Sequence, residues 1–383
     1  MFRYETSQSG HNYQKSTPLP VRMTLMSNSN PFIYCGCQNG AQAALKQEIL
    51  ATWPQFRFSF SRPGFVTFKV PSDFPLKSLP TLDLKSTFAR CSGISLGSVD
   101  CDDPEVRIQQ ISQLVESAQL GPIQHLHVWQ RDTDTPGNRG FEPGRDATTD
   151  QLGQKIATSL NMDGLQINRI ARPDERILDI ILLDEHHWWA GWHQATRTVS
   201  RWPGGIYSIN PPSSIVSRAY RKMEEAIRWS RLPMKAGDLV AEIGSSPGGS
   251  CQALLERDLH VLGVDPAEMH ETVLAHPNFT HIRKKAAEMK RSEFANVKWL
   301  MSDSNVAPNY TLDSVENIVN NERTNIRGML LTLKLIKWEL ATELPIYMDR
   351  IRSWGYQYVR ARQLAFNRQE VCVAVQRSRS KRR

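Results

Sequence analysis

Lys334 lies inside an otherwise apolar run, GMLLTLKLIKW, at residues 328–338. The composition of this run is typical of a β-strand that is covered on both faces. An ammonium group in such a strand must lose its hydration, and buried charges are kept where they are paired or have a chemical task. Lys334 is therefore expected to have either an ion-pair partner or a role in a chemical reaction.

A second stretch that could do chemistry is AEIGSSPGGS at residues 241–250, between a predicted strand and a predicted helix. Gly244, Gly248 and Gly249 would let the backbone of this turn approach a ligand closely. About twenty residues further on, the strand HVLGVD ends in Asp265, whose carboxylate could accept hydrogen bonds from ribose hydroxyls. This combination predicts a site for a nucleoside-containing cofactor.

The turn departs from the pattern that binds a dinucleotide, because Ser246 stands where a second glycine is needed for the pyrophosphate. Glu242, just before the loop, would also repel a phosphate. A nucleoside without phosphates, such as S-adenosylmethionine, therefore fits better than NAD. A glycine-rich turn followed by an acidic strand end also occurs in α/β proteins without a cofactor, so the loop alone leaves a structural role open.

The elements that must position these residues alternate between helices and strands over residues 214–377. Strands are expected in DLVAEIG, HVLGVD, THIRKK, VKWLMSD and GMLLTLKL, and the terminal strands in YQYVRARQL and EVCVAVQR. Strands separated by helices predict a doubly wound, mostly parallel sheet, and the terminal pair predicts an antiparallel edge. The predicted fold class is α/β, with a Rossmann-like catalytic domain.

The first half of the chain has a different pattern. Residues 1–30 are polar and aperiodic, which predicts a disordered extension. Residues 31–102 suggest a strand, a helix and a hairpin, hence a small α+β unit, and residues 103–200 predict a second unit that ends in a hairpin at 176–193. Proline, glycine and serine then indicate a linker at residues 201–213. A basic tail occupies residues 378–383.

EIGSSPGG, at residues 242–249, resembles the first S-adenosylmethionine motif of Rossmann-like methyltransferases. The form D/E-x-G-x-x-P-G-G is that of ribose 2′-O-methyltransferases related to FtsJ. The resemblance implies an S-adenosylmethionine site made by Glu242, Gly244, Ser246, Pro247, Gly248, Gly249, Asp265 and Asp303.

Such enzymes carry a Lys-Asp-Lys-Glu tetrad on four separate elements, and this sequence has a matching residue on each. SRAYRK supplies Lys222 on the first helix, and MSDSNVAP supplies Asp303 after the fourth strand. Lys334 lies on the fifth strand, and NRQEVCV supplies Glu370. Taken singly, Lys222 could be a surface lysine, Asp303 a strand-end acid and Glu370 an edge charge. Their joint occurrence in the right order favours the tetrad.

The resemblance also implies the chemistry. A ribose 2′-hydroxyl is a weak acid and a poor nucleophile, so a base must take its proton during the in-line transfer of the methyl group. Lys334 is the expected base, and burial together with a second ammonium would help it to give up its own proton. Lys222 is expected to supply that ammonium and to contact the substrate. Asp303 and Glu370 would orient the amines, and Asp303 would face the positively charged cofactor.

ARQLAFNRQEVCVAVQR, at residues 361–377, together with Lys337 resembles the ribosomal RNA large-subunit methyltransferase M family. That resemblance implies a cytidine of 23S rRNA as the substrate, met before full ribosome assembly. It also implies that residues 31–102 are ferredoxin-like and that residues 103–200, which include WWAGWHQ, are an RNA-binding THUMP-like domain.

The sequence departs from the family pattern in two motifs. Lys285 and Ala286 occupy the place where an acid usually meets the adenine, and Glu288 is the nearby acid. Ala219 replaces a hydroxyl residue of the cytidine-directed relatives. Adenine recognition and the exact target nucleotide therefore stay open.

Composition and charge limit the classes of protein to which this chain can belong. The net charge of +8 favours a polyanionic partner, although many basic proteins bind no nucleic acid. Six scattered cysteines indicate reduced thiols, a cytoplasmic location and no structural metal. Neither a membrane-length apolar run nor a secretory signal is present in the sequence. The chain is expected to act as a monomer or a homodimer.

Other functions stay open. A non-catalytic RNA-binding protein with a degenerate methyltransferase fold is disfavoured by the intact tetrad. An NAD-dependent dehydrogenase is disfavoured by Ser246 and the P-G-G turn. Amine methylation is disfavoured because Ser304, Asn305 and Val306 follow Asp303, where amine-directed relatives have two prolines and an aromatic residue.

Overall fold

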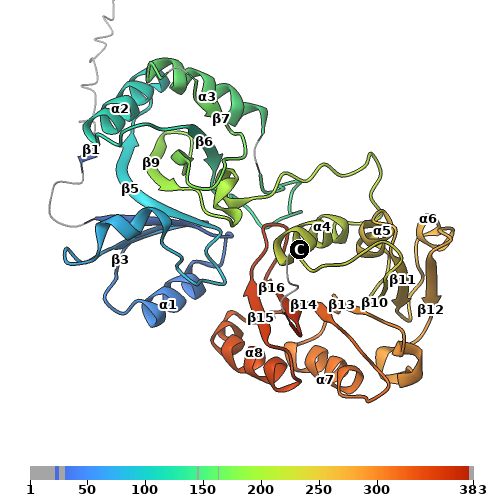
Figure 1. Cartoon of the computed structure of the whole chain (residues 1–383). Helices are drawn as coiled ribbons and strands as arrows, with labels where there is room; N and C mark the ends of the chain where they lie inside the picture. Colours follow the sequence, from blue (N-terminus) through green and yellow to red (C-terminus); the bar gives the residue numbers. More distant parts are fainter. Residues whose placement is uncertain (1–21, 26–30, 145, 163, 379–383) are drawn as a thin grey trace, which may run out of the picture.

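The computed structural model describes residues 22–25, 31–144, 146–162 and 164–378. Two β-sheets follow one another along the chain, with strands β1–β9 in the first and β10–β16 in the second (Figure 1). Among these residues, no helix combines the length and apolarity needed to cross a membrane.

The elements of the first half are β1 (Arg22–Leu25), β2 (Phe32–Gly36), α1 (Gln42–Thr52), β3 (Arg57–Arg62), β4 (Phe65–Lys69), β5 (Cys91–Asp100), α2 (Pro104–Ser117), β6 (His125–Gln130), α3 (Ala147–Ser159), β7 (Gln166–Ile167), β8 (Arg176–Leu182) and β9 (His187–Gln194). Those of the second half are α4 (Ala219–Ser230), β10 (Leu239–Ile243), α5 (Gly249–Leu255), β11 (His260–Val264), α6 (Glu271–Leu274), β12 (Phe279–Ile282), β13 (Trp299–Ser302), α7 (Pro308–Val319), β14 (Gly328–Lys334), α8 (Leu344–Ser353), β15 (Tyr358–Arg362) and β16 (Glu370–Gln376).

The first sheet has the strand order β3-β4-β2-β5-β9-β8-β6-β7, with β1 paired to β5. Strand β5, which the sequence pattern did not predict, is hydrogen-bonded to β2 on one side and to β9 on the other. The sheet is therefore continuous across residue 102, where the sequence predicted a boundary between two units. Trp188 and Trp189 of the WWAGWHQ segment are buried in it, as expected for core residues.

Strand β1 lies within residues 1–30, for which the sequence predicted a disordered extension. It pairs with residues 97–100 of β5. The pairing of β5 with β2 stops at Ile94, so the longer β5 strand has backbone groups left for β1. Residues 1–21 and 26–30 lie outside the described residues, as do residues 379–383 of the predicted basic tail.

The second sheet has the order β12-β11-β10-β13-β14-β16-β15. Strands β10 to β14 pair in parallel, whereas β16 is antiparallel to both β14 and β15. This arrangement confirms the predicted α/β class with a mostly parallel sheet and an antiparallel edge.

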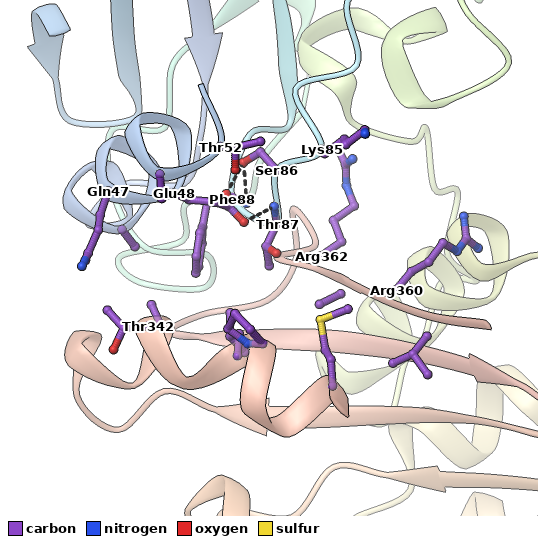
Figure 2. A pocket seen from close by; sticks show the side chains of 18 of the residues that line it. Gln47, Glu48, Thr52, Lys85, Ser86, Thr87, Phe88, Thr342, Arg360 and Arg362 are labelled. Atoms are coloured by element: carbon purple, nitrogen blue, oxygen red, sulfur yellow. Dashed lines mark hydrogen bonds between the residues drawn. The ribbon is translucent and has the colours of Figure 1, made fainter. Parts of the chain in front are cut away.

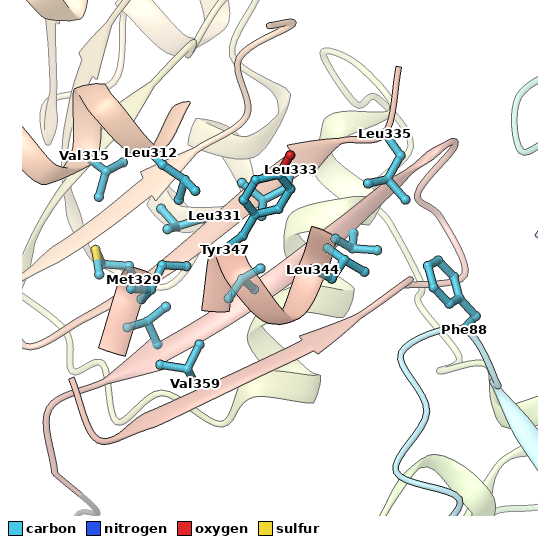
Figure 3. Close-up of a cluster of buried hydrophobic side chains, with 14 of the residues drawn as sticks. Phe88, Leu312, Val315, Met329, Leu331, Leu333, Leu335, Leu344, Tyr347 and Val359 are labelled. Atoms are coloured by element: carbon cyan, nitrogen blue, oxygen red, sulfur yellow. The ribbon is translucent and has the colours of Figure 1, made fainter. Parts of the chain in front are cut away.

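Strand β14 is covered on both faces, as its apolar sequence predicted. Met329, Leu331 and Leu333 pack beneath α7 and α8, where they meet Leu312 and Tyr347 (Figure 3). The alternate residue Leu330 belongs to the core on the other face, together with residues of α4 and α5. Because side chains alternate along a strand, Lys334 lies on the face that carries α4.

The connection between the two sheets is packed against both halves. Residues 203–207 of the predicted linker are buried. Ile206 packs on Ala365 and Phe366 of the second half, and the rings of Trp202 and Tyr207 are 4.7 Å apart. The halves are thus held together by core contacts as well as by the chain itself.

Candidate active site

Strand topology brings the chemically active residues to one edge of the second sheet. Asp303 directly follows β13, and Lys334 is the last residue of the adjacent parallel strand β14. Glu370 is the first residue of β16 and stands opposite Lys334 in the antiparallel register. Lys222 comes from the first turn of α4. The structure therefore brings together all four residues of the predicted tetrad.

The four side chains form a closed ring of ion pairs. Nζ of Lys222 lies 2.5 Å from Oδ2 of Asp303 and 2.8 Å from Oε1 of Glu370. Nζ of Lys334 lies 2.9 Å from Oδ1 of Asp303 and also contacts Oε2 of Glu370. Each carboxylate thus binds both ammonium groups, and each ammonium binds both carboxylates. This answers the question raised by Lys334: its charge is paired twice.

The electrostatics of the ring favour the charged forms of Lys222 and Glu370. Burial lowers the pKa of Lys222, but the carboxylates of Asp303 and Glu370 raise it by more, so the pKa lies above its usual value. Burial raises the pKa of Glu370, but Lys222 and Lys334 lower it further, to about 2. Glu370 is therefore ionised at neutral pH, and Lys222 keeps its ammonium, as the tetrad hypothesis expects.

Asn367 is a residue of this site that the sequence argument missed. Its Nδ2 donates a hydrogen bond to Oε1 of Glu370 at 3.0 Å, and its side chain is buried. It also lines a cavity of about 20 Å³ beside Lys222 and Asp303, a volume close to that of one water molecule. Its position three residues before Glu370 was the signal in the sequence that could have drawn attention to it.

The glycines of the 241–250 loop set the distance between this loop and the tetrad elements. Gly244 has φ of +78°, and a Cβ there would lie 2.9 Å from the carbonyl oxygen of Asp303. A Cβ on Gly249 would lie 2.2 Å from Oγ of Ser217 and 3.0 Å from the backbone nitrogen of Tyr220. Glycine at these two positions lets the loop pack against the segments that carry Asp303 and Lys222.

The sequence predicted that Glu242 would carry a charged carboxylate that repels phosphate, and the structure does not support that charge. Glu242 is buried in β10 behind the loop, and Sγ of Cys251 donates to its Oε2 at 2.9 Å. Burial raises its pKa to about 8, although Cys251 and Ser250 donate hydrogen bonds that lower it. A mostly neutral carboxyl gives little repulsion at neutral pH. The preference for a ligand without phosphates therefore depends on the turn, in which Ser246 replaces the second glycine of a dinucleotide site.

Asp265 lies directly after β11, where the sequence placed it. Its Oδ2 accepts a hydrogen bond from the backbone N–H of Ser246 at 3.2 Å, and its Oδ1 accepts from that of Ala267 at 2.8 Å. The hydroxyl of Ser246 donates to the carbonyl of Glu268 at 2.7 Å. A carboxylate oxygen can accept two hydrogen bonds, so Asp265 keeps capacity for ribose hydroxyls.

The structure also shows the surroundings of the two motifs that depart from the family pattern. Glu288 is exposed, and its carboxylate accepts from the backbone N–H of Lys285 at 3.4 Å. Ala219 is the first residue of α4, and the hydroxyl of the nearby Ser217 accepts from its N–H at 3.3 Å. Ser217 thus brings a hydroxyl to the start of α4, beside Gly249, although residue 219 has none.

A separate groove of about 880 Å³ lies between α1 and the segment formed by α8 and β15 (Figure 2). Glu48 points into it, but its carboxylate is engaged by the backbone N–H of Thr87 at 2.7 Å and by the hydroxyl of Ser86. Arg360 and Arg362 line the same groove. None of the four tetrad residues is among its lining residues, so we place the candidate active site at the tetrad.

Known proteins are similar to this sequence. Residues 215–344 match the model of a family described as FtsJ-like methyltransferase. A protein of Alkalilimnicola ehrlichii named Ribosomal RNA large subunit methyltransferase M is 26% identical over 288 residues, which cover 70% of this chain and 73% of that protein. A protein of Xanthomonas oryzae pv. oryzae with the same name is 24% identical over 298 residues, covering 76% of this chain and 82% of the relative.

Proposed function

From the premise that residues 215–344 are an FtsJ-like methyltransferase domain, as their sequence predicted, we propose that this chain methylates RNA. The reaction is the transfer of a methyl group from S-adenosylmethionine to a ribose 2′-hydroxyl. The observation that carries the proposal is the closed ring of Lys222, Asp303, Lys334 and Glu370 at one edge of the sheet.

The cofactor residues are those of the loop and the two adjacent strand ends. The carboxylate of Asp265 offers acceptor capacity to ribose hydroxyls, and the loop that contains Gly244 and Gly248 would hold the amino-acid part. Asp303 would face a positive charge. When bound, S-adenosylmethionine supplies a methyl group on a positively charged sulfur. A carboxylate next to that charge and an unphosphorylated nucleoside pocket fit this chemistry.

Lys334 is the proposed base. In its neutral form, Nζ of Lys334 would take the proton of the 2′-hydroxyl while the oxygen forms its bond to the methyl carbon. The bond between that carbon and the sulfur would break at the same time, and S-adenosylhomocysteine would leave. Lys222 keeps its ammonium, contacts the substrate and places a positive charge near Lys334. Much of the rate is then expected from holding the hydroxyl and the methyl group in line.

The proposed substrate is a cytidine of 23S rRNA, met before full ribosome assembly. Two observations support ribosomal RNA: the relatives are named as ribosomal RNA large subunit methyltransferases, and the chain carries a net charge of +8. Residues 103–200 are the proposed RNA-binding part and would act as a THUMP-like domain, next to a ferredoxin-like unit of residues 31–102.

Two measurements test this function. Calorimetric titration should show binding of S-adenosylmethionine and none of NAD; binding of NAD instead would favour a dehydrogenase. Methyl incorporation from labelled S-adenosylmethionine should be seen with naked 23S rRNA and be weaker with assembled subunits. Binding of both cofactor and RNA without any methyl transfer would favour the non-catalytic alternative.

A further inference from the structure

We propose that Gln38, a residue of the first half of the chain, is a positioning residue for the tetrad in the second half. This inference rests on the proposed function, because it concerns the same reaction. It assigns to the first half a task beyond holding RNA, namely fixing the geometry of the catalytic carboxylate Glu370.

Gln38 connects the two halves through its side-chain amide. It follows β2 and is 2% exposed. Its Nε2 donates to the backbone carbonyl of Asn367, and its Oε1 accepts from Nε2 of Gln363 at 2.5 Å. Gln363 and Asn367 belong to the segment that links β15 to β16, and each is 1% exposed. One amide of the first half therefore holds this segment at two points.

The segment passes this constraint on to the tetrad. The backbone carbonyl of Asn367 is held by Gln38, and its side-chain Oδ1 accepts from the backbone N–H of Leu364 at 2.9 Å. With these two contacts made, its Nδ2 donates to Oε1 of Glu370 at 3.0 Å. The same oxygen atom of Glu370 lies 2.8 Å from Nζ of Lys222. The orientation of the carboxylate between the two lysines thus depends on Asn367.

Two further contacts tie the first half to the segments that carry tetrad residues. Arg368, two residues before Glu370, donates from Nε to the carbonyl of Pro136 at 3.0 Å. Arg218, just before α4 and Lys222, pairs with Glu142 at 2.6 Å and 3.1 Å. The same loop of the first half therefore contacts both segments. How the halves dock sets the relative position of Lys222 and Glu370.

Buried hydrogen bonds between amides specify a single arrangement more strictly than apolar packing does. Misplacement of catalytic groups by about 1 Å can cost about a hundredfold in rate. The network around Gln38 consists of neutral amides, and the side chain of Gln38 itself bonds only to Gln363 and Asn367 among the described residues. Its loss should therefore slow the chemical step and leave the binding of both substrates almost unchanged.

The first test is the variant Gln38→Met in the full chain, because methionine keeps the volume and removes both hydrogen bonds. We expect kcat for methylation of 23S rRNA to fall about tenfold or more, with KM for RNA and Kd for S-adenosylmethionine within about twofold of the unsubstituted chain. The matched control is Asn39→Ala. Asn39 is the next residue, and its side chain donates to Thr133 within the first half. It should keep the kcat of the unsubstituted chain.

A double-mutant cycle separates positioning from general destabilisation. If Gln38 acts through Asn367, then Gln38→Met should reduce kcat much less in an Asn367→Ala background than in the unsubstituted chain. If the fold-reduction in kcat of the double variant equals the product of the two single reductions, the proposal is wrong. An unchanged kcat in Gln38→Met would also overturn it.

A readout independent of activity distinguishes failure of this proposal from failure of the proposed function. Pulse labelling with acetic anhydride, followed by mass spectrometry, reports how well each lysine is held in its ion pairs. Gln38→Met and Asn367→Ala should both increase labelling of Lys222 and Lys334, while labelling of the exposed Lys155 stays constant. Increased labelling in a chain that transfers no methyl group would keep the positioning role and reject the function. Unchanged labelling of both lysines would reject the positioning role.

Discussion

Glu370 stands directly opposite Lys334 in the antiparallel pair of β14 and β16, and its carboxylate contacts both Lys334 and Lys222. One acidic side chain thus joins a lysine on a strand to a lysine on a helix. Glu370 is only 4% exposed, so the two ammonium groups depend on it for charge compensation in a place that water barely reaches.

Glu370→Gln should therefore cost both stability and activity. The substitution keeps the shape but leaves two ammonium groups facing the single carboxylate of Asp303. Removing one partner of a buried ion pair destabilises a protein by about 3 kcal/mol or more. Urea unfolding at pH 7 should show this loss, and methyl transfer should fall by about two orders of magnitude with it. A variant with the stability and activity of the unsubstituted chain would contradict the ring of ion pairs.

Gly249→Ala tests the packing of the glycine loop against α4. The added Cβ would lie 2.2 Å from Oγ of Ser217 and must push α5 away from the start of α4, which carries Lys222. We expect lower stability and weaker binding of S-adenosylmethionine in calorimetry. Adding Ser217→Ala removes the closest of the clashing atoms and should restore part of both. If Gly249→Ala alone binds the cofactor normally, the glycine is not needed for this approach.

The sequence and the structure agree where local patterns decide the outcome. The four tetrad residues could be predicted because their motifs resemble those of ribose 2′-O-methyltransferases. Asp303 and Lys334 also lie at the carboxyl ends of adjacent parallel strands, which meet at one edge of the sheet. The network of Gln38 and Asn367 was not readable, because the two residues are 329 positions apart and meet only when the halves dock. The neutral state of Glu242 could not be predicted from the sequence either, because it follows from burial rather than from the residue type.

Glu242 predicts a pH dependence with a definite sign. Its pKa of about 8 in the folded chain lies above the usual value, so the folded state binds the proton more tightly than the unfolded state does. The resulting stability is fully present below about pH 4.5 and is lost as the pH rises towards 8. Glu242→Gln should remove this loss. Urea unfolding of the unsubstituted chain and of Glu242→Gln at pH 5.5 and pH 8.5 measures this difference in the free energy of unfolding. If that free energy changes equally with pH in the two proteins, Glu242 is ionised in the folded chain.

A buried histidine in the first sheet predicts a second pH effect. Nδ1 of His193 lies 2.6 Å from Oδ2 of Asp179, and its Nε2 lies 2.8 Å from the carbonyl oxygen of Ser200. Both partners only accept hydrogen bonds, so the ring must donate from both nitrogens and is positively charged. Burial lowers the pKa of His193, but Asp179 raises it by more, to a value above the usual range.

The stability from His193 is fully present below about pH 6.5 and is lost as the pH rises through the raised pKa. His193→Gln should destabilise the chain by about 3 kcal/mol at pH 6 and by much less at pH 9. His186→Gln, at an exposed position nearby in sequence, is the control and should change neither value. An equal loss of stability at both pH values would mean that the ring is neutral.

Lys334→Met tests the central claim most directly. The purified chain and the variant are each incubated with unmethylated 23S rRNA and labelled S-adenosylmethionine, and the products are digested to nucleosides. We predict 2′-O-methylcytidine from the unsubstituted chain and from the control Lys337→Met, whose side chain is exposed. Lys334→Met should give none while it still binds the cofactor. Continued formation of 2′-O-methylated product by Lys334→Met, or methylation of a base nitrogen or carbon instead, would contradict the account.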